Sequence, residues 1–146
     1  VIRTSWLYSV YGNNFVKKIL KLGNQRDKLN VIFDQVGTPT NASDLAKICL
    51  DILSYKKQSK MNSKGKIYHF SNEGVASWFD FATAIMALAK ADCSIEPIET
   101  KDYTTKAKRP HFSVLNKSKI KNDFEITIPY WRDSLTICIS KLNKKI

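Results

Sequence analysis

The chain alternates between short apolar runs and longer segments in which apolar residues recur every three to four positions. A short run predicts a buried strand, and the longer spacing predicts a helix with one apolar face. The resulting order begins strand, helix, strand, helix, strand, helix, which is typical of an α/β fold. The predicted strands are residues 1–5, 29–33, 65–71 and 112–115, and the predicted helices are residues 14–24, 41–53, 77–91, 116–121 and 129–142.

Capping and helix-breaking residues set the expected ends of these helices. Gly23 and the following asparagine end the first helix, and Ser77 caps the third. From Ser54 onward we expect a polar Lys/Ser loop instead of helix. Asn116 is placed to cap a short helical turn, and Pro129 to start the last helix.

A polar turn at residues 34–40, Asp-Gln-Val-Gly-Thr-Pro-Thr, follows the strand at 29–33 and precedes a helix. Open α/β folds bind ligands at the carboxyl ends of their strands, so this turn is a candidate binding edge. The alternative is an ordinary connection, because Gly and Pro occur in most loops. Residues 99–112 form a second aperiodic stretch, longer than inert connections usually are, with Tyr103, Arg109 and His111 on it.

Length and composition fit one compact unit. The 146 residues are 43% hydrophobic, enough for the core of one domain or of part of a larger one. No apolar run approaches the roughly 20 residues of a membrane span, and no secretory leader pattern opens the chain. We therefore expect a cytoplasmic protein without a membrane partner. The chain starts inside an apolar strand pattern without Met, which predicts that upstream sequence is missing.

The net charge of +11 and the pI near 9.6 favour an anionic partner. The lysines, however, are spread along the chain. Aromatic and basic residues do not alternate as they do on surfaces that bind single-stranded nucleic acid. A nucleotide or a sugar diphosphate needs fewer cations than a nucleic acid. We therefore expect a small anionic ligand and no nucleic acid.

Cysteine and histidine give no support for a metal site. Cys49, Cys93 and Cys138 are odd in number and widely spaced, which favours reduced thiols in the core. No Cys-x-x-Cys pair exists, and His69 and His111 are far apart. We expect no bound metal.

An ordered set of motifs resembles the dTDP-4-dehydrorhamnose reductases, a family of extended short-chain dehydrogenases/reductases. The Arg-Thr-Ser-Trp and Asp-Gln-x-Gly-x-Pro-Thr pieces are the most specific, and the match is to the carboxyl-terminal half of the family. The matching pieces are Arg3-Thr4-Ser5-Trp6-Leu7-Tyr8, Gly12-Asn13-Asn14-Phe15-Val16, Asp34-Gln35-Val36-Gly37-Thr38-Pro39-Thr40, Asp44-Leu45-Ala46, Ile67-Tyr68-His69, Ser77-Trp78, Arg109-Pro110 with Ser113 and Leu115, and Trp131-Arg132.

The resemblance implies the carboxyl-terminal part of a Rossmann-like reductase, with short strands, helices and an incomplete sheet. Such a reductase uses NADPH, or NADH, to reduce the 4-keto group of dTDP-6-deoxy-L-lyxo-4-hexulose to dTDP-L-rhamnose. The catalytic residues and the Gly-rich phosphate loop belong to the amino-terminal half, and no tyrosine here is followed by Lys four residues on. Residues 1–146 are therefore expected to be the sugar-nucleotide part, inactive alone, with no catalytic residue of its own.

The resemblance also implies site residues on the first strand. Arg3, Thr4 and Ser5 are expected near the cofactor, although Arg3 is alternatively structural. Trp6 is expected to lie along the deoxysugar and to donate its indole N–H to a hydroxyl. A core tryptophan is the alternative.

The remaining implied site residues face the nucleotide sugar. Asn14 either caps a helix or reaches a phosphate or sugar group. Arg109 is the expected diphosphate anchor, because its planar fork pairs with phosphate oxygens. We expect Trp6 and Arg109 to share one hollow with Thr38. The residues expected to line the nucleotide side are Gln35, Gly37, Thr38 and Thr40.

Departures from the family pattern leave other readings open. The family usually has Tyr-Pro-Thr-Pro-Ala where residues 103–107 read Tyr-Thr-Thr-Lys-Ala, and Asn41 stands where an aromatic or small residue is common. A non-catalytic binding or regulatory subunit of the same fold is one alternative, and a basic nucleic-acid module is another. A homodimer is also compatible with the family.

Overall fold

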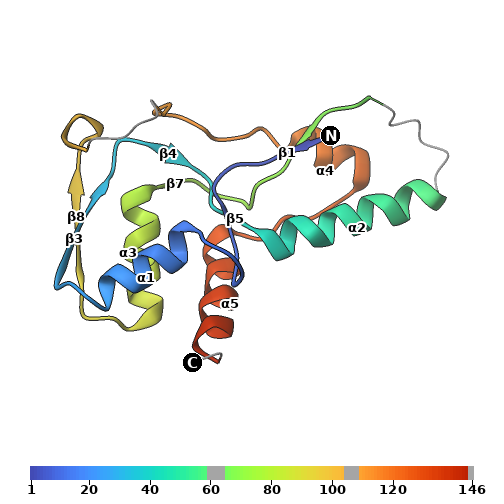
Figure 1. The fold of residues 1–146 in the computed structure, drawn as a ribbon. Helices are drawn as coiled ribbons and strands as arrows, with labels where there is room; N and C mark the ends of the chain where they lie inside the picture. Colours follow the sequence, from blue (N-terminus) through green and yellow to red (C-terminus); the bar gives the residue numbers. More distant parts are fainter. Residues whose placement is uncertain (59–64, 104–108, 145–146) are drawn as a thin grey trace.

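The computed structural model describes residues 1–58, 65–103 and 109–144, and it is an α/β fold of short strands alternating with helices (Figure 1). Side chains are described throughout these ranges except at residues 56–58. The elements are β1 (Ile2–Arg3), β2 (Leu7–Tyr8), α1 (Phe15–Gly23), β3 (Lys28–Ile32), β4 (Val36–Gly37), β5 (Thr40–Asn41), α2 (Ala42–Gln58), β6 (Tyr68–His69), β7 (Ala76–Ser77), α3 (Trp78–Ala89), β8 (Ser94–Ile98), the 3₁₀ turn η1 (Thr100–Asp102), α4 (Ser118–Phe124) and α5 (Trp131–Asn143).

The strands pair two by two. β1 pairs with β6, β2 with β5 and β3 with β8, all in parallel, whereas β4 and β7 are antiparallel. Parallel neighbours far apart in sequence require crossover connections, which the helices supply. The expected α/β class with an incomplete sheet is confirmed for the described residues.

Two predicted helices have the expected caps. Asn14 accepts a hydrogen bond from Lys17 N at 3.2 Å and thereby starts α1. Ser77 and Asp80 form a reciprocal capping box at the start of α3, with Ser77 Oγ accepting from Asp80 N at 3.0 Å. These side chains satisfy backbone N–H groups that the first turn of a helix leaves unpaired.

Several predicted boundaries are wrong. α2 continues to Gln58 instead of ending at Ser54, because lysine and glutamine are good helix formers even without an apolar pattern. The predicted strands at 1–5 and 65–71 shrink to the pairs β1 and β6. The predicted strand at 112–115 is only a bridge between Phe112 and Val36.

β8 is a strand that the apolar pattern does not predict. Pro97 lies within it, opposite Val31 of β3. Proline cannot donate to a strand ladder and is tolerated only at an edge, and within the described residues β8 pairs with β3 alone. The β3–β8 pair therefore explains why a proline-containing segment is extended here.

Apolar side chains form two separate cores. The cavity layer, as we call it, consists of α1, β3, β8, α3 and α5, and its core includes Val16, Phe81 and Leu135. The α2–α4 layer consists of α2, α4, β1 and β6, and its core includes Ile120 and Phe124. Figure 1 shows the first layer around α1 and α3, with α2 and α4 extending away from it on the other side.

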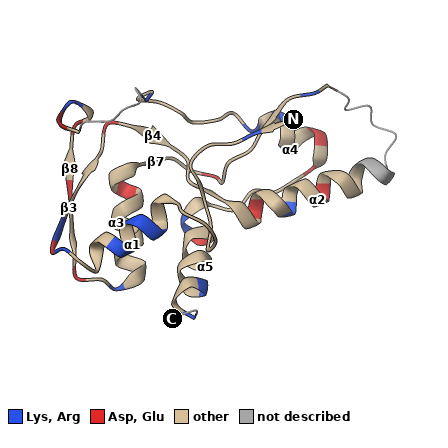
Figure 2. Cartoon of the chain, viewed as in Figure 1, with Lys and Arg blue, Asp and Glu red and all other residues tan. Residues whose placement is uncertain are grey.

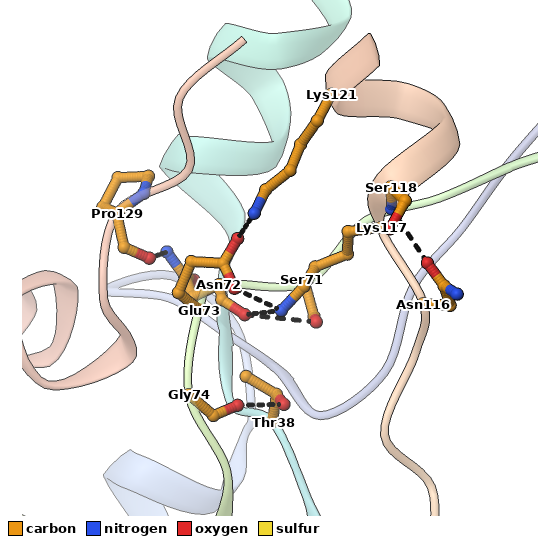
Figure 3. A network of polar contacts seen from close by, with 10 residues as sticks. All are labelled: Thr38, Ser71, Asn72, Glu73, Gly74, Asn116, Lys117, Ser118, Lys121 and Pro129. Atoms are coloured by element: carbon orange, nitrogen blue, oxygen red, sulfur yellow. Dashed lines mark hydrogen bonds and ion pairs between the residues drawn. The ribbon is translucent and has the colours of Figure 1, made fainter.

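Hydrogen-bonded polar residues around Asn72 and Glu73, which we call the polar seam, join the two layers. Asn72, fully buried, accepts from Asn41 N at 2.8 Å and donates to Asp44 of α2 at 2.6 Å and to Ser134 of α5 at 3.1 Å. At its α4 side, Lys117 bonds Asn72 O at 2.8 Å and pairs with Glu73 at 3.0 Å (Figure 3). Buried polar groups are tolerated when paired in this way.

A second lysine contacts Glu73 in the polar seam. Lys121 of α4 also reaches its carboxylate (Figure 3). Burial alone would raise the pKa of Glu73, but the hydrogen bonds from Lys121 and Lys117 outweigh burial, so its pKa is lowered. The carboxylate therefore stays ionised between two ammonium groups.

Three further features bear on the sequence predictions. Cys93 and Cys138 are buried, Cys49 is half-buried, and all three are free thiols. No cluster of three potential metal-ligating side chains occurs among the described residues. No helix in residues 1–58, 65–103 or 109–144 is long and apolar enough to cross a bilayer.

Candidate functional site

A cavity of about 900 Å³ lies in the cavity layer, between α1, β3 and the start of α3. Ligand pockets of small molecules commonly have this size and combine an apolar wall with a few polar groups. The residues that line it are Phe15, Lys18, Ile19, Leu22, Arg26, Lys28, Leu29, Asn30, Val31, Ile32, Gln35, Trp78, Ile98, Asp102, Tyr103 and Arg109.

Cations dominate the polar part of the lining. The lining contains one acidic residue, Asp102, and four cations: Lys18, Arg26, Lys28 and Arg109. Lys28 is compensated by Glu96, 2.7 Å away and outside the lining. Figure 2 shows the basic residues of α1 and of the β3 start in blue on this layer. An apolar wall with a cationic surround suits a ligand that carries both a ring and an anionic group.

Aromatic rings build one wall of the cavity. Trp78 lines the cavity and stacks on Trp6 in parallel, with 3.5 Å between ring centroids and 3° between planes. Phe15 of α1 packs on Trp78 at 4.6 Å and on Phe81 at 5.5 Å. Trp6 therefore lies one ring behind the cavity wall and supports it.

Trp6 is held in an uncommon backbone conformation. Its φ of +48° falls in the left-handed region, which bulky residues rarely adopt. Its Nε1–H donates to Ser113 Oγ at 3.1 Å, and Ser113 Oγ donates to Val36 O at 3.1 Å. Strained residues cluster at functional sites, where the surrounding structure holds them in place.

Gly37 allows this arrangement. A Cβ at Gly37 would lie 2.6 Å from Trp6 ring atoms and 2.6 Å from Ser113 Oγ. Only glycine therefore lets β4 pass this closely behind the tryptophan. The structure brings Trp6 and Gly37 together, and both lie next to the cavity.

Gln35 and Arg109 belong to the cavity lining itself. Gln35 is 3% exposed, and its Nε2 donates to Thr100 Oγ1 at 3.0 Å. Arg109 is exposed at the cavity edge, directly after residues 104–108, which lie outside the described residues together with most of the Tyr-Thr-Thr-Lys-Ala departure. These two predicted residues share one hollow.

Thr38, Thr40 and Asn14 lie elsewhere. Thr38 and Thr40 have 0% exposure, and Thr38 Oγ1 donates to Gly74 O at 2.7 Å (Figure 3). The expectation that Trp6, Thr38 and Arg109 share one hollow is wrong, because neither Trp6 nor Thr38 belongs to the lining of this cavity. Asn14 serves as the α1 cap. Ligand contact by Thr38, Thr40 and Asn14 stays a prediction.

The predicted cofactor residues lie at the end of the short strand β1, which Arg3 completes, and directly after it. Arg3 and Thr4 are exposed, and Ser5 is half-buried. Ser5 Oγ has no hydrogen-bond partner among the described residues. The segment therefore has hydrogen-bonding capacity that the described chain does not use.

Several lining residues are absent from the predicted site. Phe15 and Trp78 belong to helices, where an apolar residue facing a cavity has the same spacing as one facing the core. Arg26 and Lys28 follow the end of α1, and nothing in their local pattern separates them from a solvated surface. Phe15 and Trp78 do lie within pieces that match the family, but nothing in the sequence indicates that their rings meet to form a wall.

Comparison with known proteins gives a consistent set of relatives. The family model described as the RmlD substrate binding domain matches residues 1–144. The dTDP-4-dehydrorhamnose reductase of Aggregatibacter actinomycetemcomitans is 41% identical over 141 residues, which cover 92% of this chain and 48% of that protein. The spore coat polysaccharide biosynthesis protein SpsK of Bacillus subtilis strain 168 is 38% identical over 135 residues, 92% of this chain and 44% of that protein.

A solved structure agrees with these relatives. The crystal structure of dTDP-4-dehydrorhamnose reductase from Bacillus anthracis str. Ames in complex with NADP superposes with a TM-score of 0.86 at 33% identity. The match covers 96% of this chain and 47% of that one. The chain thus spans about half the length of the curated relatives it matches.

Proposed function

Since the chain belongs to the RmlD substrate binding domain family, we propose that it supplies the sugar-nucleotide pocket of a dTDP-4-dehydrorhamnose reductase. The reaction is the reduction of the 4-keto group of dTDP-6-deoxy-L-lyxo-4-hexulose to dTDP-L-rhamnose, with NADPH or NADH as reductant. The observation that carries this proposal is the cavity of about 900 Å³, with its aromatic wall and Arg109 at its edge.

Each part of a dTDP-sugar has a matching part of the site. The thymidine lies between α1 and β3, against the apolar lining that includes Phe15 and Ile19. The diphosphate meets the guanidinium of Arg109, whose charge-assisted bonds to phosphate contribute about 1.5–3 kcal/mol each. The deoxysugar lies toward the stacked pair of Trp6 and Trp78.

The cofactor is held mainly outside this chain. Arg3 and Thr4 offer exposed groups at the end of β1 and directly after it, and Ser5 Oγ has an unused hydrogen-bonding capacity, which fits a polar neighbour such as the nicotinamide ribose or amide. When bound, NADPH supplies the hydride. No Tyr-x-x-x-Lys pair occurs in the 146 residues, so this chain orients the sugar nucleotide and contributes no proton donor of that type.

Binding of dTDP tests the pocket. Titration calorimetry of the chain with dTDP should give saturable binding, and thymidine should bind more weakly because it lacks the phosphates that pair with Arg109. An absence of dTDP binding up to about 1 mM, a free energy of about −4 kcal/mol, would contradict the proposal.

An assay of NADPH oxidation tests whether this chain is inactive alone. The chain mixed with NADPH and the 4-keto substrate should bind the sugar nucleotide without oxidising NADPH. NADPH oxidation by the chain alone would contradict the assignment of residues 1–146 to the sugar-nucleotide part. A non-catalytic subunit of the same fold is the second candidate, and it predicts dTDP binding without turnover in any longer protein. Cytoplasmic location and a homodimer stay predictions.

A further inference from the structure

The segment that carries Tyr103 and Arg109 is attached at both ends to the same short stretch, residues 34–36. At its start, Thr100 bonds Asp34 and Gln35. At its end, Val36 N donates to His111 O at 2.8 Å, and Ser113 N donates to Val36 O at 2.9 Å. Thr100 on one side of this stretch and His111 and Ser113 on the other are thereby attached to residues 34–36, whose Gln35 lines the cavity.

Asp34 provides several of these attachments. Its Oδ1 accepts from Thr100 N at 2.9 Å and from Thr100 Oγ1 at 2.6 Å. His111 Nδ1 lies 3.0 Å from Asp34 O and 3.7 Å from Asp34 Oδ2. The hydrogen bond from Thr100 is the main cause of the lowered pKa of Asp34, so the carboxylate is ionised at neutral pH.

A direct role in ligand binding does not suit Asp34. An ionised carboxylate only accepts hydrogen bonds and repels a diphosphate, and this one already accepts two from Thr100. Asp34 is absent from the cavity lining, whereas its neighbour Gln35 is part of it. Its contacts therefore fix chain position instead of contacting a ligand.

We propose that Asp34 is a positioning residue for Arg109: its carboxylate holds His111, two residues after Arg109, and Thr100, three residues before Tyr103, and thereby keeps Tyr103 and Arg109 at the edge of the cavity. The inference rests on the proposed function, because it assumes a diphosphate at Arg109. Positioning in advance lowers the conformational entropy that a long arginine side chain and its loop lose on binding.

A double-mutant cycle measured by dTDP titration tests the coupling. Arg109→Ala should weaken dTDP binding about a hundredfold and Asp34→Ala about tenfold. In the Arg109→Ala background, Asp34→Ala should add less than about twofold, because its effect acts through that arginine. Thymidine binding should stay unchanged in Asp34→Ala. Asp51→Ala, the same change on α2 beside Lys47, should leave dTDP binding unchanged.

Two milder variants keep the test decisive if Asp34→Ala fails to fold. Thr100→Val keeps the shape of the side chain but removes the hydroxyl that donates to Asp34 and accepts from Gln35. Asp34→Asn leaves the Gln35 contact in place and keeps an acceptor without the charge, so it isolates the role of Asp34. Both should fold, shown by an unchanged circular dichroism spectrum, and weaken dTDP binding about threefold or more. Hydrogen exchange at Thr100 N–H should accelerate in Asp34→Asn.

The outcomes separate the two proposals. Wild-type chain that binds dTDP, with folded Asp34 or Thr100 variants that bind it equally well, would overturn the positioning role alone. Losses that add fully in the double variant, or an equal loss of thymidine binding, would also overturn it, since they indicate a general structural effect. Wild-type chain that does not bind dTDP would overturn the proposed function and the positioning role together.

Discussion

The cavity layer and the α2–α4 layer differ in the length of their paired strands and in the size of their apolar cores. The cavity layer has the five-residue strand pair β3–β8 and a core that extends through α1, α3 and α5. The α2–α4 layer has only the two-residue pair β1–β6, a smaller core, and exposed leucines on α2, with Leu50 65% and Leu53 58% exposed.

The proposed binding site belongs to one of these two layers. The cavity of about 900 Å³ and the contacts of Trp78 with Trp6, which is stacked, and with Phe15, which is tilted, belong to the layer with the larger continuous core. Exposed leucines on one face of a helix are typical of a surface that packs against another element. We therefore expect changes in the cavity layer to affect the ligand, and equally disruptive changes in the α2–α4 layer to affect stability alone.

The largest expected effect is the loss of stability on truncating Phe81 in the core of the cavity layer. Phe81 is fully buried and contacts the rings of Tyr8 and Trp131 at 5.3 and 5.8 Å. Phe81→Ala should lower the free energy of unfolding by about 3–5 kcal/mol and weaken dTDP binding, because α3 carries Trp78. Urea unfolding and calorimetry measure the two effects.

Phe124→Ala is the matched change in the α2–α4 layer. Phe124 is buried against Tyr55 and Tyr68, so its loss should also destabilise the chain. At temperatures where this variant is folded, its dTDP affinity should equal that of the wild type. Equal losses of dTDP affinity in Phe81→Ala and Phe124→Ala would show that the ligand does not depend on the cavity layer more than on the α2–α4 layer.

The next effect concerns charge at the cavity edge. Arg109→Ala should weaken dTDP binding about a hundredfold, or about 2.7 kcal/mol, with little change in the free energy of unfolding, because the side chain is exposed. Lys47→Ala removes an exposed cation of the α2–α4 layer and should leave the affinity unchanged. Unchanged affinity in Arg109→Ala would remove this arginine from the site.

Gly37→Ala tests the close contact behind the aromatic wall. The added Cβ would overlap Trp6 and Ser113, so we expect a destabilisation of about 1–3 kcal/mol. Displacement of Trp6 should also weaken the exciton signal of the stacked tryptophans in circular dichroism. Trp6→Phe should partly restore stability in the Gly37→Ala background. A fully stable Gly37→Ala variant with an unchanged spectrum would contradict the contact.

The smallest effect lies in the polar seam. The pKa of Glu73 is lowered in the folded chain, below the value of about 4.3 of an unfolded glutamate. Its ionised form therefore stabilises the fold above about pH 5. That stabilisation, about 1 kcal/mol or less for a partly exposed group, is lost as the pH falls through the folded pKa.

Thermal unfolding measured from pH 6 to pH 3 checks this sign. The wild type should lose more stability on acidification than Glu73→Gln, which has no carboxylate to protonate at this position. Parallel curves for the two proteins would show that the lysine contacts of Glu73 contribute nothing to the pH dependence.

Sequence patterns predicted the elements whose ends are marked by side chains. α1 and α3 follow from their apolar spacing together with Asn14 and Ser77 as caps. β8 could not be predicted, because Pro97 argues against a strand and only pairing with β3 makes it one. The end of α2 was missed because lysine and glutamine continue a helix without an apolar pattern.

The site was predictable only in part. Gln35, Gly37 and Arg109 stand out as motif residues; Gln35 and Arg109 line the cavity, whereas Gly37 packs against Trp6, behind the cavity wall. Thr38 belongs to the same motif but is buried, since a motif does not specify which side of a turn each residue faces. The Asp34–Thr100 contact joins residues 66 positions apart, so no local pattern could indicate it.

A structure of the chain with bound dTDP tests the central claim most directly. We expect the thymidine in the cavity between α1 and β3, and a diphosphate oxygen within hydrogen-bond distance of the Arg109 guanidinium. A dTDP molecule bound against α2 and α4, or bound in the cavity with Arg109 turned away from its phosphates, would contradict it.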